Sequence, residues 1–276
     1  MTTARWWRTV LMAALLLGGT ATRAQARARA EADDPSPLQQ RGAQVGTALL
    51  VQYYEALPDA GDDDGHPSRS ARLKALAAFK KKVAARYTEG TLQRLLNCPS
   101  ATTRRAAALA LGLLGSMRSN EDVAALLRDD DRQVRLLAAN ALWSLWFRAD
   151  TDANNRELQR LMGLDDPPEA LEGLDALIKK APDFAEAYNQ RAILFFRVGE
   201  YQKSVADCAA VVKLNPYHFG AQSGMAQSYM KLKKPRAALR AFRNALRINP
   251  SLQGVEETIR ALEDVLGEEG KRDDKK

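Results

Sequence analysis

Histidine and cysteine are well suited to nucleophilic, acid–base or metal chemistry, and this 276-residue sequence has only two of each. His66 and His218 lie about 150 residues apart, and neither is beside a candidate nucleophile. No glycine-rich phosphate loop, cysteine-pair metal motif or nucleophile elbow is present. The sequence therefore predicts no catalytic residue, no cofactor and no metal. We expect that the protein is not an enzyme.

One acidic stretch, Asp62-Asp63-Asp64-Gly65-His66, has residue types that could coordinate a cation. A calcium-binding loop needs ligands at alternating positions and a glutamate at its twelfth position. Here that position falls near Ala71, and the spacing of the ligands is also absent. The stretch is therefore predicted to be a solvated acidic loop rather than a metal site.

The two cysteines could form a disulfide in an oxidising compartment. Cys98 is expected at a helix end, whereas Cys208 falls at a core position that Phe242 occupies one repeat later. The favoured interpretation is two separate thiols, with Cys208 buried as a small apolar side chain. A disulfide is the alternative.

The elements that would position functional side chains are helices arranged in a repeat. A shift of 34 residues places Ala192 on Ala226 and Pro216 on Pro250. Each copy holds two amphipathic helices that can bury their apolar faces only by stacking on neighbouring helices. The first copy is predicted to have helix A over 185–198 and helix B over 202–214.

This pattern resembles the tetratricopeptide repeat (TPR) family, which has aromatic and small residues at fixed positions before a closing proline. The second copy departs from the family where Gln222 replaces an aromatic residue and Lys233 replaces glycine. Half a copy precedes the two, and a capping helix over 253–266 follows. The resemblance covers about 115 residues. The matching residues of the first copy are Tyr188, Ala192, Phe195, Ser204 and Pro216.

The resemblance implies that helix A residues line a concave, peptide-binding face. Amide side chains can pair with a peptide backbone, and the apolar side chains can hold those of a partner. Packing of this face against the chain's own termini is the alternative. The predicted groove residues are Asn155, Gln159, Asn189, Ile193, Phe196, Ser223, Gln227 and Met230.

A second repeat, with a period of 31 residues, precedes the first. It places Arg104 on Arg135 and Leu111 on Leu142, and it resembles HEAT repeats of the short bacterial type. Their hallmark is an acidic turn followed by Val-Arg and an alanine-rich helix, here Asp129–Asp131 and then Val134-Arg135. The resemblance implies structural roles, with the aspartate at a helix N-terminus and Arg135 bracing the neighbouring turn.

The first 26 residues have the features of a cleaved signal peptide. Arg5 and Arg8 precede the apolar run Val10–Leu17, and Ala24-Gln25-Ala26 offers a cleavage site. Residues 9–22 carry no charge. These 14 residues would span only about 21 Å as a helix, which is less than a hydrocarbon core of about 30 Å. We therefore expect an exported protein of the periplasm or cell envelope, or a secreted one, with no stable membrane span after cleavage. A permanent anchor is the alternative.

Charge is uneven along the chain. Removal of the signal peptide, with three arginines and no acid, lowers the formal net charge from +7 to +4, so global charge does not indicate nucleic acid. No Asp or Glu occurs from Cys208 to Val255. This stretch is expected to be a solvated helix face, and the alternative is a docking patch for an acidic protein or an anionic envelope surface. Its basic patch is Lys231, Lys233, Lys234, Arg236, Arg240, Arg243 and Arg247.

Together these patterns predict an all-α solenoid of helix-pair repeats that acts as a non-catalytic protein–protein interaction scaffold of the cell envelope. Its partner would be a protein or peptide, and not nucleic acid. The alternatives are an enzyme with an unrecognised site that acts on envelope material, and docking of the basic face to an anionic partner. The predicted divisions are a signal peptide over 1–26, a flexible tether over 27–43, HEAT-like repeats over 44–150, TPR-like repeats with a capping helix over 151–268, and a charged tail over 269–276.

Overall fold

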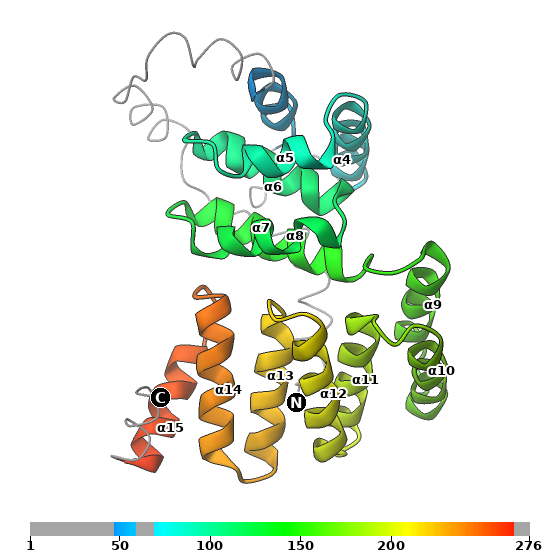
Figure 1. Cartoon of the computed structure of the whole chain (residues 1–276), viewed down its shortest axis with the longest axis vertical. Helices are drawn as coiled ribbons and strands as arrows, with labels where there is room; N and C mark the ends of the chain where they lie inside the picture. Colours follow the sequence, from blue (N-terminus) through cyan, green and yellow to red (C-terminus); the bar gives the residue numbers. More distant parts are fainter. Residues whose placement is uncertain (1–46, 59–68, 268–276) are drawn as a thin grey trace. The chain divides into compact units, whose positions relative to one another are not determined.

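The computed structural model describes residues 47–58 and 69–267 of the chain (Figure 1). All regular elements in these ranges are helices, and no strand occurs in them, which confirms the predicted all-α class. The predicted signal peptide, tether, acidic loop and charged tail lie outside the described residues. No helix of the described residues is long and apolar enough to cross a membrane.

Contacts divide the chain into two compact units, and helix α8 (Arg132–Trp146) belongs to both. The first unit comprises the described residues up to Gly115 together with 130–141, and the second comprises 116–129 and everything from Leu142 onward. This division falls inside α8. The predicted boundary after residue 150 was placed from the repeat patterns in the sequence, and it stays a prediction.

The first unit is built on alanine-rich helices that approach closely. Its core includes Leu50, Phe79 and Val83, together with a run of fully buried alanines on α6. A side chain on Gly112 would come within 3.1 Å of Ala141, so glycine is what allows α6 and α8 to approach at this point. The helices of this unit are one over 47–55, α4 (Arg69–Ala84), α5 (Glu89–Leu95), α6 (Ala101–Leu114) and the first part of α8.

Aspartate and arginine have structural roles in this unit, as the HEAT resemblance implies. The carboxylate of Asp131 accepts a hydrogen bond from the backbone N–H of Val134 at 2.9 Å and pairs with the Arg105 guanidinium. Arg135 donates to the backbone oxygen of Asp130 at 3.1 Å, in the turn that precedes its own helix. Arg104, one repeat earlier, donates to the carbonyl oxygens before its helix in the same way.

From residue 152 onward, the second unit is a row of helices in which each packs on the next (Figure 1). The 34-residue period places small residues at the close helix contacts, and all of them are buried: Ala192, Ser204, Ala226 and Ala238. The hydroxyl of Ser204 lies 2.9 Å from that of Ser228. The unit begins with α7 (Asn120–Ala125) and the end of α8. The further helices are α9 (Asp152–Met162), α10 (Pro167–Lys180), α11 (Ala185–Arg197), α12 (Tyr201–Leu214), α13 (Phe219–Lys231), α14 (Pro235–Ile248) and α15 (Val255–Leu266).

Candidate peptide-binding face

Helices α11 and α13 are the helix A elements of consecutive copies, and they contact one another directly. Ile193 and Phe196 on α11 correspond to Gln227 and Met230 on α13, 34 residues later. Residues three or four apart on a helix share a face, so each helix presents one row of these side chains. Met230 is 43% exposed, and the other three are partly exposed, as is Ser223.

Two predicted groove residues are buried instead. Asn189 is only 3% exposed, and its amide donates to Glu186 at 2.9 Å. Asn155 is 7% exposed, donates to the backbone oxygen of Asp150 at 2.7 Å, and accepts from the backbone N–H of the same residue. A buried amide needs internal partners because water cannot reach it. These two side chains therefore complete the interior, whereas Gln159 on α9 is exposed.

The buried partner of Asn189 belongs to a polar cluster that joins α11 to α13. Glu186 and His218 are both fully buried, and Glu186 Oε2 lies 3.1 Å from His218 Nε2. His218 Nδ1 accepts the backbone N–H of Ala221 at 2.9 Å, so the ring proton is on Nε2, which donates to the carboxylate. The other carboxylate oxygen accepts from Asn189 and Gln190. The histidine thus caps the N-terminus of α13 and is fixed in one tautomer.

An aromatic cluster from the end of α8 covers this histidine within the second unit. The Trp146 ring stacks on the His218 ring with centroids 4.1 Å apart, and Trp143 meets the same ring edge-on at 5.3 Å. Phe219 lies within 5.6 Å of both tryptophan rings. The cluster therefore packs as core and holds the start of α13 in place.

A buried chain of hydrogen bonds runs beside the aromatic cluster. The indole N–H of Trp146 donates to Asn120 at 2.7 Å, and the Asn120 amide donates to Asn215 at 3.0 Å. Asn215 Oδ1 also accepts the backbone N–H of Tyr217, an Asx turn that ends α12. Asn249 forms the same turn one repeat later. Residues 116–129 are thereby joined to the TPR-like helices.

Comparison with known proteins identifies the two kinds of repeat. A family model described as HEAT repeats matches residues 88–187, and a model described as tetratricopeptide repeat matches residues 221–252. The chain therefore contains one segment similar to HEAT repeats and a second segment similar to the tetratricopeptide repeat. The HEAT match extends through α9 and α10, which the sequence register assigns to the TPR-like block.

One curated relative of this repeat protein is a TPR repeat-containing protein of Rhizobium etli, 38% identical over 99 residues. The match covers 36% of this chain and 48% of the relative, so the chain spans about half the length of the curated relative it matches. Two solved structures of TPR proteins are also similar to this chain, at low sequence identity. The first TPR of Spaghetti bound to an HSP90 peptide is 19% identical, with a TM-score of 0.37, and the match covers 42% of this chain and 88% of that one. A thermophilic TPR protein of Thermus thermophilus is 18% identical, with a TM-score of 0.34, and the match covers 79% of this chain and 97% of that one.

The repeat protein carries its predicted basic residues mainly on α14. Arg236, Arg240, Arg243 and Arg247 follow one another at intervals of three or four residues and share one face of this helix. Arg243 forms an ion pair with Glu263 of α15 at 2.8 Å, and Arg247 donates to Asn244. Lys231, Lys233 and Lys234 are exposed at the end of α13 and in the turn that follows.

Sequence reasoning did not identify Arg191, which joins three helices of the second unit. Its guanidinium makes two hydrogen bonds to Asp207 on α12, at 2.7 and 2.8 Å, and one to Asp175 on α10 at 2.7 Å. Both carboxylates raise the pKa of the Arg191 guanidinium above its ordinary value. In the sequence, Arg191 lies 16 residues from Asp175 and 16 residues from Asp207. This spacing was the only available signal, and it does not distinguish a partly buried ion pair from an exposed one.

Proposed function

We propose that this repeat protein is a non-catalytic scaffold that binds an extended segment of a partner protein on the face formed by α11 and α13. The observation that carries the proposal is the exposure of apolar side chains, Met230 above all, in register with exposed polar ones on two adjacent helices. We define this face by five residues: Ile193, Phe196, Ser223, Gln227 and Met230.

The chemistry of these side chains indicates the kind of segment that fits. Gln227 can donate to and accept from a peptide backbone, and the Ser223 hydroxyl can do the same. Ile193, Phe196 and Met230 offer apolar area, and methionine adapts to side chains of different shapes. The segment would be extended, with an apolar side chain directed at α11 and another at α13.

The proposed absence of catalysis is supported by the state of the titratable groups. The His218–Glu186 pair resembles a general-base arrangement, but both side chains are fully buried and occupied by internal hydrogen bonds. Burial raises the pKa of the Cys208 thiol to about 12, with the Asp207 charge as a smaller cause, so the thiolate nucleophile is absent near neutral pH. No group of three or more metal-ligating side chains occurs within residues 47–58 and 69–267.

The proposal places this scaffold in the cell envelope or outside the cell, on the basis of residues 1–26. Expression of the full chain with a C-terminal tag, followed by fractionation and N-terminal sequencing, tests the location. We expect a periplasmic or secreted species that begins near Arg27. A cytoplasmic species that begins at Met1 would contradict it.

Binding is tested by selecting peptides from a displayed library against the full chain and measuring their affinities by fluorescence anisotropy. Phe196→Ala and Met230→Ala should each weaken binding about tenfold, since each removes a buried apolar contact of about 1.4 kcal/mol. Gln202→Ala, an exposed change on α12, is the control and should leave affinity unchanged. Peptides that bind the Phe196 and Met230 variants as tightly as the unchanged protein would place the interaction elsewhere.

A further inference from the structure

Positive charge in this protein is concentrated in the first unit. The described residues of this unit, 47–58, 69–115 and 130–141, include twelve Lys or Arg and four Asp or Glu, a net charge of +8. The described residues of the second unit, 116–129 and 142–267, include nineteen of each kind and have no net charge. An anionic surface is therefore attracted to the first unit rather than to the second.

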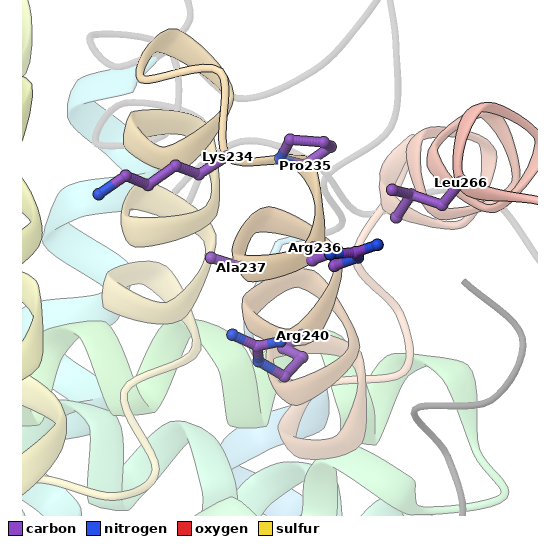
Figure 2. A pocket seen from close by; sticks show the side chains of 6 residues that line it. All are labelled: Lys234, Pro235, Arg236, Ala237, Arg240 and Leu266. Carbon is purple, nitrogen blue, oxygen red and sulfur yellow. The ribbon is translucent and has the colours of Figure 1, made fainter. Parts of the chain in front are cut away.

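The second unit does have a cationic hollow, at the start of α14. Figure 2 shows the side chains that line it, and its volume is about 350 Å³. Arg236 and Arg240, two of its three cations, already interact with other groups in the structure. The hollow therefore offers fewer available cations than its lining suggests, in a unit whose described charges balance.

Most of the excess charge of the first unit lies on and just after α4. Seven of the twelve cations occur there, and no Asp or Glu occurs from the start of this helix up to Glu89. The buried residues of α4 are Phe79 and Val83, which are four positions apart, so one side of the helix faces the core. Lys82 lies over the Tyr53 ring, with its ammonium nitrogen 5.3 Å from the ring centroid. The cations on the remaining side of α4 face outward.

This outward side of α4 carries both lysine and apolar residues. At about 100° per residue, seven exposed residues lie within an arc of about 120° on it. Leu73, the one large apolar side chain among them, is 50% exposed. The three lysines form no hydrogen bond or ion pair with another residue that the structure describes. We define the α4 face by these seven residues: Ser70, Leu73, Lys74, Ala77, Lys80, Lys81 and Ala84.

We propose that the α4 face binds the surface of a membrane that contains anionic phospholipids. The exposed leucine and two alanines can enter the boundary between headgroups and acyl chains, while the lysine ammonium groups reach the phosphates. A lysine close to an anionic membrane surface contributes about fivefold in affinity, so the three lysines together supply on the order of a hundredfold. Charge and apolar area thus act at the same place on the helix.

Two features of the face favour a lipid surface over an acidic protein. Its cations are all lysines, whose flexible stems can follow a diffuse anionic surface, whereas arginine suits paired hydrogen bonds to a fixed carboxylate. Its leucine lies among the lysines, which is the arrangement of a helix that lies in a membrane interface. The α4 face shares no residue with the face of α11 and α13, so the two interactions can be tested separately.

Residue-resolved lysine labelling of the full chain tests the contact. Phosphatidylglycerol and phosphatidylcholine have no primary amine, so a water-soluble acetylating reagent modifies the protein alone, and mass spectrometry measures the rate at each lysine. At about 50 mM salt, saturating vesicles that contain phosphatidylglycerol should slow acetylation of Lys74, Lys80 and Lys81 about tenfold. Vesicles of phosphatidylcholine alone should leave these rates unchanged, even where another segment of the chain holds the protein at the vesicle.

Lys179 and Lys180, an exposed pair at the end of α10, are the control within the same sample. Their acetylation should not change. The variant Leu73→Ser should lose about threefold or more of the protection, because it removes the large apolar side chain while every charge remains. Protection should also fall at about 1 M salt, where the Debye length is about 3 Å.

Three results would contradict membrane binding by α4. Unslowed acetylation of its lysines with anionic vesicles would overturn the proposal. Equal slowing at Lys179 and Lys180 would do so as well, because the contact would then not belong to α4. Full protection in Leu73→Ser would exclude the apolar contact and leave only nonspecific attraction between charges.

Discussion

Lys233 occupies, with φ of 56°, the left-handed turn position that Gly199 occupies with φ of 86° one repeat earlier. Both turns close their helix in the same way. The backbone N–H of Glu200 donates to the carbonyl of Phe195, and that of Lys234 to the carbonyl of Tyr229. These bonds between residues five apart are those of a Schellman cap, whose left-handed residue is usually glycine. The repeat geometry is therefore kept in the second copy at the cost of backbone strain.

Replacing Lys233 by glycine should stabilise the protein. A side chain in the left-handed region costs about 1–2 kcal/mol, and the greater freedom of glycine in the unfolded chain offsets about 0.4–1 kcal/mol. We expect a net gain of about 0.5–1 kcal/mol in the free energy of unfolding in urea. Lys234→Gly is the control, because Lys234 has φ of −112° and the same charge. A gain from both variants would show that charge, not strain, is responsible.

The indole of Trp146 is predicted to contribute through its hydrogen bond as well as its ring. The variant Trp146→Phe lacks the indole N–H that donates to the Asn120 side-chain oxygen at 2.7 Å. That oxygen then has no donor while it is buried, which lowers the free energy of unfolding by about 1–3 kcal/mol. Lost ring volume adds to this cost. We expect the free energy of unfolding to fall by about 2–4 kcal/mol. Trp143→Phe, at a half-buried position, should cost less, and equal losses would contradict a special role for the Trp146–Asn120 bond.

Residues before position 151 should be needed for a stable TPR-like block. A fragment over 151–276 lacks Trp146 and Asn120, and so uncovers His218 and the Asn215 side chain. A fragment over 116–276 retains both. Loss of a buried tryptophan alone costs about 3–5 kcal/mol, so the shorter fragment should unfold at a clearly lower urea concentration. Equal midpoints would show that the contacts of α7 and α8 contribute little.

The ion pair of Asp131 predicts a pH dependence of stability. Burial raises the pKa of this carboxyl, but hydrogen bonds from Arg105 and the Val134 N–H outweigh it and hold the pKa below its ordinary value of 3.8. A group with a depressed pKa stabilises the fold above its unfolded pKa, and loses this contribution as the pH falls through its folded pKa.

Asp131→Asn should therefore cost stability at pH 7, by about 1 kcal/mol because the pair is partly exposed, and progressively less below about pH 4. Urea unfolding at pH 7, 5 and 3 measures the difference. Asp130→Asn, an exposed neighbour, is the control. A loss for Asp131→Asn that does not shrink toward pH 3 would exclude charge as its origin.

The two cysteines should differ in reactivity. Both are free thiols in the structure; Cys208 is 2% exposed and Cys98 is partly exposed. A pKa of about 12 leaves about one Cys208 thiolate in 10⁴ at pH 8. An aromatic disulfide reagent at pH 8 should therefore titrate one thiol in the native protein and two after unfolding. Cys98→Ser should remove the native signal, and a persistent signal would mean that Cys208 is accessible.

The sequence alone determined the helices and their order. The 34-residue period predicted helix A over 185–198 and the capping helix over 253–266, and the structure has them at Ala185–Arg197 and Val255–Leu266. Local signals suffice here because apolar spacing, small residues at close contacts and Asn-Pro turns act within one helix pair. Cys208 was placed in the core for the same reason.

Tertiary structure alone decided which polar side chains are available. The family register assigns Asn189 to an exposed face, yet its amide is buried because it donates a hydrogen bond to Glu186. Glu186 is itself paired with His218, which lies 32 residues away in the sequence. The hydrogen bond between Asn120 and Asn215 spans 95 residues. A polar side chain looks the same in sequence whether water or a distant buried partner satisfies it. Only the packing that excludes water determines which of the two it is.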